Sequence, residues 1–286
     1  MGETLFVAEV SSNHHADLDR CRQFIDVAAD IGCRAVKFQL FKIKELFAPQ
    51  ILQRSALHRE RQQWELPVNF LPELVRRCRE KNVQFGCTPF YLDAVDELEP
   101  HVDFYKIASY ELLWDDLLRR CAATGKPIVL STGMADLTET RHAVAVLREA
   151  GCCRLTLLHC ASVYPVRSNQ CNLQVLETLR RNFDCPVGWS DHSACPDVIF
   201  RAVHRWQADM IEFHLDLDGQ GAEYSFGHCW LPPAIRHVIT SVNNGIDADG
   251  DACKRPSAAE RKEREWRADP IDGLRPLLPI RDSWKG

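Results

Sequence analysis

Eight short apolar runs alternate with longer amphipathic segments between residues 5 and 214, and this alternation constrains the fold more than any other feature. The runs are rich in β-branched, aromatic and leucine side chains, as the buried strands of a parallel sheet are. The predicted strands are residues 5–10, 34–39, 83–88, 103–108, 127–131, 154–159, 186–190 and 209–214. The segments between them carry apolar residues every three or four positions, which predicts helices with one buried face.

The predicted helices cover residues 18–31, 71–81, 114–124, 137–150, 172–182 and 197–206, and several end at a turn residue such as Gly32, Gly125 or Gly151. Eight strands, each followed by a helix or a connection of helical length, predict an α/β fold, the (β/α)₈ TIM barrel. A doubly wound parallel sheet is the alternative, since six such units would also satisfy the alternation. No Gly-x-Gly-x-x-Gly follows the first strand, where a dinucleotide-binding sheet needs it.

We expect two regions, a catalytic barrel over residues 1–245 and a C-terminal extension, 246–286, that packs on the barrel. From Asn243 onward the chain has Asp-rich and Arg/Glu-rich stretches and four prolines, and little helix is predicted there beyond residues 258–267. The connection 40–68 is long and charged, which is typical of a lid or a binding loop.

Composition excludes several classes of protein. The 286 residues are 45% hydrophobic and carry 35 Lys and Arg against 40 Asp and Glu, a balance that argues against nucleic-acid binding. No apolar run reaches the roughly 20 residues of a membrane span, and no signal peptide is visible, so we expect a cytoplasmic protein. The 13 cysteines are odd in number and lack Cys-x-x-Cys spacing, which predicts reduced thiols rather than disulfides or a cysteine zinc site.

In a TIM barrel the chemistry lies where strands end, at the carboxyl face. Polar side chains stand at or just beyond every predicted strand end, and burying a lysine or a glutamate without a partner costs several kcal/mol. These residues are Glu9, Lys37, Gln39, Thr88, Lys106, Ser109, Glu111, Ser131, His159, Ser162, Tyr164, Ser190, His192, Glu212 and His214. Their convergence on one rim therefore predicts a functional site.

The rim residues sort into two chemical groups. Lys37 and Lys106, with several hydroxyls, would form a cationic, donor-rich pocket that suits a phosphorylated acidic small molecule. His192 and His214 end neighbouring strands near Glu9 and Glu212, which predicts a divalent metal site. Two imidazoles with oxygen ligands suit Mn²⁺, Fe²⁺, Co²⁺ or Zn²⁺ better than Mg²⁺ or Ca²⁺. A histidine pair acting as acid and base is the alternative.

A set of short segments, in order from residue 7 to residue 214, resembles the sialic acid synthase family. This family holds the phosphoenolpyruvate-dependent N-acetylneuraminate synthases and their legionaminate and pseudaminate relatives. The matching segments are Val7-Ala8-Glu9 with Asn13-His14, Ala35-Val36-Lys37-Phe38-Gln39, Thr88-Pro89-Phe90, Tyr105-Lys106-Ile107-Ala108-Ser109 with Glu111, Leu130-Ser131-Thr132-Gly133-Met134, His159-Cys160 with Tyr164-Pro165, Gly188-Trp189-Ser190-Asp191-His192 and Ile211-Glu212-Phe213-His214.

The resemblance implies condensation of phosphoenolpyruvate with an N-acetylmannosamine-like aldose, giving a nonulosonic acid and phosphate. It assigns phosphoenolpyruvate to Lys37, Thr88, Lys106, Ser109, Ser131 and Ser190. It assigns the metal, usually Mn²⁺ with Mg²⁺ or Co²⁺ as alternatives, to His192 and His214. Glu111 would assist the addition of water, Glu9 would lie beside the reacting carbons, and Gln39 and Tyr164 would contact the sugar.

The sequence departs from the family pattern on the sugar side. Family members continue into an antifreeze-protein-like domain whose arginine reaches the partner subunit's sugar, whereas this sequence ends at Gly286. Glu223 stands where the family has a sugar-binding aspartate, and Ser162 where some members have asparagine. An arginine of the tail (Arg264, Arg267 or Arg275) is one hypothesis for a replacement, and a solvated surface helix is the other. The expected assembly is a barrel-to-barrel homodimer.

Two other functions stay open from the residues alone. Lys37 or Lys106 could form a Schiff base with a keto acid in an aldolase or lyase. Alternatively, the barrel could bind a sugar phosphate without catalysis, although the retained carboxylates, lysines and histidines argue against a decayed site.

Overall fold

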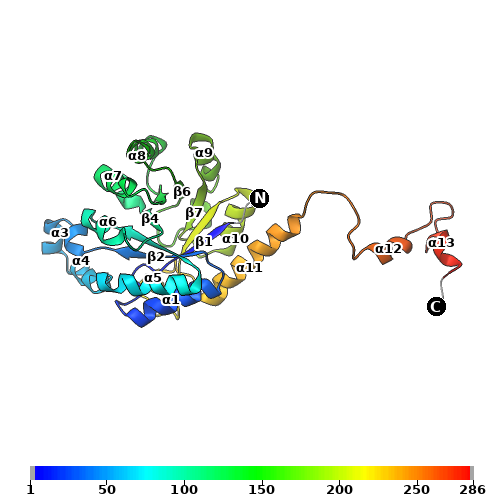
Figure 1. The fold of residues 1–286 in the computed structure, drawn as a ribbon, viewed down its shortest axis with the longest axis horizontal. Helices are drawn as coiled ribbons and strands as arrows, with labels where there is room; N and C mark the ends of the chain where they lie inside the picture. Colours follow the sequence, from blue (N-terminus) through cyan, green and yellow to red (C-terminus); the bar gives the residue numbers. More distant parts are fainter. Residues whose placement is uncertain (1–3, 284–286) are drawn as a thin grey trace. The chain divides into compact units, whose positions relative to one another are not determined.

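The fold is a closed barrel of eight parallel strands, seen in a computed structural model that describes residues 4–283 (Figure 1). The strands follow one another around the barrel in chain order, which confirms the TIM barrel and excludes the doubly wound sheet. They are β1 (Leu5–Glu9), β2 (Ala35–Leu40), β3 (Gln84–Pro89), β4 (Phe104–Ile107), β5 (Ile128–Ser131), β6 (Leu155–His159), β7 (Val187–Asp191) and β8 (Met210–His214).

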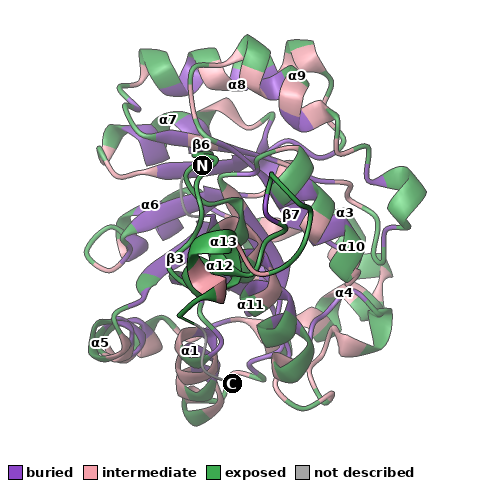
Figure 2. Ribbon diagram, turned by 90° about the vertical axis from the view of Figure 1, so that its right-hand side faces the viewer, coloured by how far each residue is buried: buried purple, intermediate pink, exposed green. Residues whose placement is uncertain are grey.

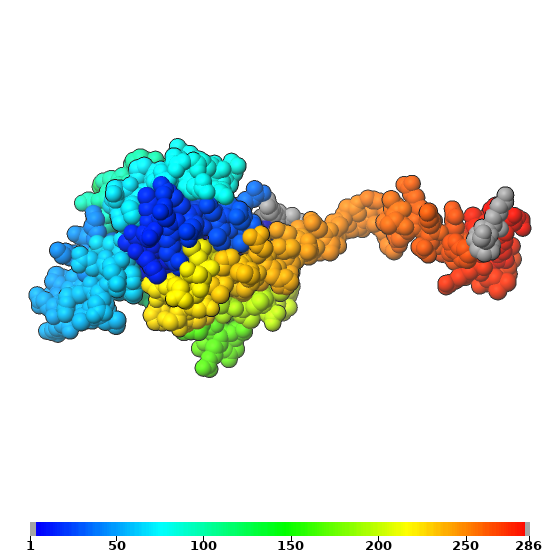
Figure 3. Space-filling view, turned by 90° about the horizontal axis from the view of Figure 1, so that it is seen from below, coloured from blue at the N-terminus to red at the C-terminus, as the bar shows by residue number. Residues whose placement is uncertain are grey.

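Pairing of the first strand with the last closes the barrel. Glu9 of β1 lies opposite Lys37 on one side and opposite His214 on the other. The surface of the barrel unit reflects this closure, because its first and last segments, coloured blue and yellow, lie side by side (Figure 3). Residues far apart in the sequence thereby become neighbours at the barrel mouth.

The barrel interior is filled in layers. A small apolar cluster in the interior holds Val7, Ala35, Phe104, Val129 and Leu158. Two residues further along four of these strands stand the polar Glu9, Lys37, Lys106 and Ser131, on the same side as the cluster because side chains alternate with a period of two. The strands are the most deeply buried part of the molecule (Figure 2). The apolar layer therefore seals one end of the barrel and leaves the polar layer facing the other.

Amphipathic helices surround the barrel, and local sequence signals define their ends. Asp17 accepts a hydrogen bond from the Arg20 amide at the start of the first helix, and Asp136 and Glu139 form a capping box at another. The helices that follow the strands are α1 (Leu18–Asp30), α5 (Leu71–Lys81), α6 (Leu92–Leu98), α7 (Asp115–Ala123), α8 (Leu137–Glu149), α9 (Val175–Asn182), α10 (Pro196–Phe200) and α11 (Pro232–Asp249). Among the described helices, none combines the length and apolar character that a membrane crossing needs.

The connection after β2 was predicted to be a long loop, but it contains several short helices. It folds into α2 (Ile43–Leu46), α3 (Pro49–Arg54), α4 (Ala56–Glu60) and a 3₁₀ turn at Arg61–Trp64. The helices are short and mostly exposed, and Ser55 caps α4 by accepting from the His58 amide. This connection places Phe41, Phe47 and Arg61 at the barrel mouth, so it does contribute to the site.

The chain divides into two compact units, Met1–Ile246 and Asp247–Gly286. The second unit contains α12 (Arg261–Glu265) and α13 (Leu278–Arg281). The first is shorter than the predicted helix 258–267, and the second was not predicted. Inside this unit Asp269 is buried and accepts hydrogen bonds from the amides of Ile271 and Leu278. The packing of this unit on the barrel stays a prediction.

Candidate active site

A cavity of about 690 Å³ opens at the carboxyl ends of the strands. Every residue predicted for the site lines it except His159 and Ser162. Its walls carry two ammonium groups, several carboxylates, Ser and Thr hydroxyls from five strands or the loops that follow them, and a group of imidazoles. This volume lies within the range of small-molecule sites, about 300–1,000 Å³.

Two buried lysines share carboxylate partners at the bottom of the cavity. Lys37 forms an ion pair with Glu9 and donates a hydrogen bond to Thr88 Oγ1 (3.1 Å). Lys106 lies 3.3 Å from Glu212 Oε1, and Lys37 lies 4.0 Å from the other oxygen of that carboxylate. Each charge is thus compensated, which the low polarisability of a barrel interior demands.

Burial and charge pull the pKa values of this network in opposite directions. Desolvation lowers the pKa of Lys37 to about 8, although Glu212 favours its charged form. Desolvation also opposes ionisation of Glu212, but Lys106 and Lys37 outweigh it and hold that pKa well below the ordinary value. With a pKa of about 8, Lys37 is mostly protonated near neutral pH and can bind an anion.

Glu111 is a buried carboxyl that also lines the cavity. It belongs to the 3₁₀ turn Ser109–Glu111 that follows β4, and its Oε2 has no hydrogen-bond partner among the described residues. Desolvation raises the pKa of Glu111 to about 7, and the nearby charge of Lys106 only partly opposes this shift. A carboxyl with such a pKa can both donate and accept a proton at neutral pH.

The hydroxyl wall is built around Gly133. Ser109 Oγ accepts from the Gly133 amide (3.0 Å) and lies 3.1 Å from Cys160 Sγ. Ser131 Oγ is buried without a partner among the described residues, so it is free to bind a ligand. Ser162 lies against Gly133 with its Oγ also buried and unpaired, but it is not among the residues that line the cavity.

Three imidazoles surround Tyr164 on the remaining side. Its ring centre lies 4.2 Å from that of His192, 4.9 Å from that of His228 and 6.1 Å from that of His214. The rings of His192 and His214 are 5.3 Å apart, so the predicted pair does converge. His192 Nδ1 lies 2.8 Å from the Ala161 carbonyl oxygen, which makes Nδ1 the donor and leaves Nε2 free.

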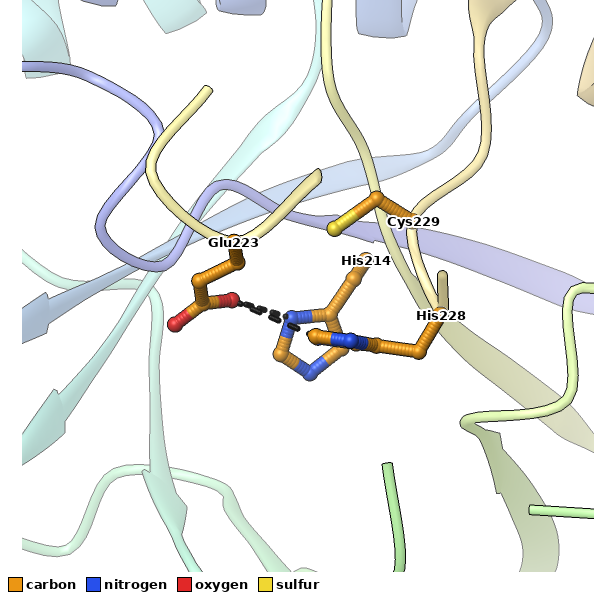
Figure 4. Close-up of side chains that lie close together, drawn as sticks. All are labelled: His214, Glu223, His228 and Cys229. Atoms are coloured by element: carbon orange, nitrogen blue, oxygen red, sulfur yellow. Dashed lines mark hydrogen bonds and ion pairs between the residues drawn. The ribbon is translucent and has the colours of Figure 1, made fainter. Parts of the chain in front are cut away.

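The Nδ1 side of the His214 ring faces Glu223, and His228 and Cys229 lie close by (Figure 4). Its Nδ1 lies 3.0 Å from Glu223 Oε2, and His228 Nε2 lies 3.5 Å from the same oxygen. One donor atom each from His214, Glu223, His228 and Cys229 falls within a 4.8 Å group. Burial lowers the pKa of His192 to about 3 and also lowers that of His214, so these imidazoles keep their lone pairs at neutral pH.

The loop after β8 brings Glu223 and His228 to the site through tertiary contacts. A bridge between Leu215 and Trp230 closes the loop at its base. Asn13 then holds the loop twice, since Nδ2 donates to the Leu215 carbonyl and Oδ1 accepts from the Glu223 amide. Ser11 Oγ donates to Glu223 Oε1 at 2.6 Å.

Several lining residues escaped the sequence analysis. Ser11, Arg61, Tyr110, Phe226 and His228 all line the cavity. They stand in loops or short helices, and none of them is the last residue of a strand. The one clue was His228, a histidine placed before Cys229 and Trp230 in an otherwise apolar stretch.

A family model described as the NeuB family matches residues 24–254, which covers most of the barrel unit. The chain belongs to the NeuB family. The synthases of this family are phosphoenolpyruvate-dependent transferases that form a carbon–carbon bond and use a divalent metal, so this NeuB-family chain is such a nonulosonic acid synthase.

Named relatives agree with this assignment. The N,N'-diacetyllegionaminic acid synthase of Campylobacter jejuni is 34% identical over 92% of this chain and 82% of its own length. The pseudaminic acid synthase of Helicobacter pylori is 31% identical over 98% of this chain and 84% of its own. The crystal structure of the N-acetylneuraminic acid synthetase of Leptospira borgpetersenii, in complex with citrate, superposes with a TM-score of 0.81 at 29% identity, covering 93% of this chain and 92% of that one.

Proposed function

We propose that this enzyme condenses phosphoenolpyruvate with an amino-sugar aldose of the N-acetylmannosamine type. The observation that supports this proposal is the convergence of Lys37, Lys106 and Glu111 with the imidazoles of His192 and His214 on one cavity. Two ammonium groups suit the phosphate and carboxylate of the donor. Gln39, Tyr164 and Glu223, which line the same cavity, offer polar and aromatic contacts to a sugar.

In the proposed reaction the enol π electrons of phosphoenolpyruvate form the new bond from C3 to the aldehyde carbon, and the aldehyde oxygen takes up a proton. Water adds to C2 and loses a proton to a base. The bond between C2 and the bridging oxygen then breaks, phosphate leaves with the electron pair, and the C2 hydroxyl loses its proton as the ketone forms. Glu111 is the base that we assign to the water.

The other residues bind and orient. Lys37, Lys106, Thr88, Ser109, Ser131 and Ser190 are assigned to phosphoenolpyruvate. Ser131 Oγ, buried and unpaired, and the two lysines offer donors to its anionic oxygens. Glu9 accepts from Gln39 Nε2 (3.0 Å) and thereby orients an amide toward the sugar.

A divalent metal, with Mn²⁺ as our choice and Mg²⁺ or Co²⁺ as alternatives, would polarise the sugar aldehyde as a Lewis acid when bound. His192 and His214 are the residues predicted to hold it. Their buried, unprotonated rings fit that role.

The proposal predicts phosphate release only when phosphoenolpyruvate, a divalent metal and a matching aldose are all present. We would test a panel containing N-acetylmannosamine, its 6-phosphate and diacetylated 6-deoxy amino sugars, following phosphate and the new keto acid by mass spectrometry. Phosphoenolpyruvate labelled with ¹⁸O at the bridging oxygen should yield labelled phosphate. An enzyme that is instead inactivated by borohydride with pyruvate, and releases no phosphate with any aldose, would be a Schiff-base aldolase.

Glu111 predicts a specific pH dependence. Its carboxylate must be ionised to accept a proton from water, so kcat should rise as pH increases through about 7, the raised pKa of this group. Glu111→Gln should lower kcat by roughly 100-fold or more and remove this limb of the pH profile. Glu149→Gln, a surface substitution, is the control. A Glu111→Gln enzyme with an unaltered acidic limb would assign the base to another residue.

A further inference from the structure

Arg61 is the one arginine that lines the catalytic cavity, among the residues that the structure describes. It begins the 3₁₀ turn Arg61–Trp64, which follows α4 in the connection after β2. Phe41 and Phe47 reach the same cavity from this connection, and Phe90 reaches it from just beyond β3. The connection therefore brings aromatic side chains and a single guanidinium group to the site.

Two aromatic rings hold the Arg61 guanidinium. Its Cζ lies 5.4 Å from the centre of the Phe47 ring and 5.7 Å from that of the Trp64 ring, and at such distances the π electrons attract a cation. The edge of the Phe47 ring packs in turn against His58, with ring centres 4.8 Å apart, and His58 Nδ1 lies 2.7 Å from Ser55 Oγ. Packing thus places the guanidinium before any ligand arrives.

The connection that carries Arg61 is also fixed at its base. Glu65 Oε1 accepts a hydrogen bond from the Ile43 amide at 2.8 Å, so the two ends of the connection are tied together. Lys42 Nζ lies 3.0 Å from Glu97 Oε1, which ties the beginning of the connection to α6. A group that is already in position loses less entropy when it binds a ligand, so affinity is higher.

The charge of Arg61 has no anionic partner in the part of the chain that the structure describes. No carboxylate between residues 4 and 283 lies within 4.0 Å of its guanidinium nitrogens. Its Nε is buried and makes no hydrogen bond to any of these residues. Leaving a buried donor without an acceptor is unfavourable, and more so for a charged group. An anionic ligand would satisfy both the charge and the donor.

The two lysines of the cavity differ from Arg61 in this respect. Lys37 pairs with Glu9, and Lys106 lies 3.3 Å from Glu212 Oε1. Both ammonium groups are nearly inaccessible to solvent, whereas Arg61 is half-buried. The lysines are assigned to phosphoenolpyruvate. Arg61 is therefore the remaining cation of the cavity, and it is available to the second substrate.

We propose that Arg61 binds a phosphate group carried by the aldose, so that the preferred acceptor is an amino-sugar phosphate rather than a neutral amino sugar. The inference rests on the proposed function, because it specifies one substituent of the acceptor in that reaction. A guanidinium presents parallel N–H donors to phosphate oxygens, and its flat faces stack on aromatic rings. Since the aldehyde carbon must meet C3 of phosphoenolpyruvate, the phosphate belongs on a carbon remote from the aldehyde.

The test compares two acceptors that differ only in the phosphate, N-acetylmannosamine and N-acetylmannosamine 6-phosphate. The full chain is assayed with saturating phosphoenolpyruvate and Mn²⁺, and the new keto acid is followed by mass spectrometry. We expect kcat/KM for the 6-phosphate to exceed that for the neutral sugar by about 100-fold or more. Raising the ionic strength should reduce this preference, because salt screens the attraction between the two charges.

Variants of Arg61 should change the preference itself. Arg61→Met should lower the ratio of the two kcat/KM values by about 100-fold. Arg61→Lys, which keeps the charge and loses the fork of donors, should give an intermediate ratio. Arg54→Met is the matched control, because Arg54 is an exposed arginine of the same connection that does not line the cavity. It should leave both kcat/KM values unchanged. Thermal unfolding of each variant checks that the fold is intact.

Equal kcat/KM values for the two acceptors in the unaltered enzyme would overturn the proposal. So would a ratio that Arg61→Met leaves unchanged, including the case in which this variant instead raises KM for phosphoenolpyruvate, since Arg61 would then serve the donor. The proposed function has a separate readout. Condensation with neutral amino sugars alone would leave that function standing and refute this assignment, whereas no condensation with any amino sugar would refute the function itself.

Discussion

Lys106→Met is expected to lower kcat/KM for phosphoenolpyruvate by about 1,000-fold or more, equivalent to roughly 4 kcal/mol of transition-state stabilisation. The ammonium group is 4% exposed, faces the cavity, and is assigned to the anionic donor substrate. The same substitution removes the partner of Glu212 at 3.3 Å. Leaving that carboxylate buried and less compensated should cost about 3 kcal/mol of unfolding free energy. Steady-state kinetics and urea unfolding measure the two effects.

The double variant Lys106→Met with Glu212→Gln separates activity from stability. Removing both charges should restore most of the unfolding free energy, because no unpaired ion remains. Catalysis should stay low, since the donor-binding charge is still missing. Activity near that of the unaltered enzyme in either variant would mean that Lys106 does not bind phosphoenolpyruvate.

Asp191→Ala is expected to reduce the free energy of unfolding by about 4 kcal/mol or more. This carboxylate is fully buried at the end of β7 and accepts hydrogen bonds from Trp189 Nε1 and Trp230 Nε1, both at 3.0 Å. It also accepts from Ser193 Oγ at 2.6 Å. The alanine variant leaves two indole N–H groups buried without acceptors and creates a cavity. Urea unfolding followed by circular dichroism measures the loss.

Asp218→Ala is the control for this experiment. Asp218 accepts from a charged donor, Arg20, at 2.9 Å, but its side chain is 49% exposed. Solvent screens such a pair, so the substitution should change stability by no more than about 1 kcal/mol. Equal effects of the two substitutions would show that the indole contacts of Asp191 add nothing to stability.

The strands could be predicted because their signal is local. All eight predicted strands coincide with an observed strand to within one or two residues at each end, for example 83–88 against Gln84–Pro89. Hydrophobic runs and turn residues lie within a few positions of one another, so no long-range information is needed. The helices in the connection after β2 were harder to predict, because they are short and exposed and carry few apolar residues. They depend on capping by residues such as Ser55.

The residues of the site also differ in whether local sequence predicts their roles. Lys37, Lys106 and Glu111 could be named because their positions follow from strand order. Asp191 is different, since its role depends on two indoles, and Trp230 stands 39 residues further along. The pattern of apolar residues carries no information about such a contact.

The sequence by itself determined the barrel, the family resemblance and the set of polar residues that face the mouth, since strand period and connectivity are encoded within neighbouring positions. Only the tertiary structure decided which of these side chains touch. The pairing of β1 with β8 sets Glu9 beside His214, and the Leu215–Trp230 bridge folds His228 and Cys229 back against it. Such distances arise from barrel closure and loop packing, which join residues that no local pattern relates.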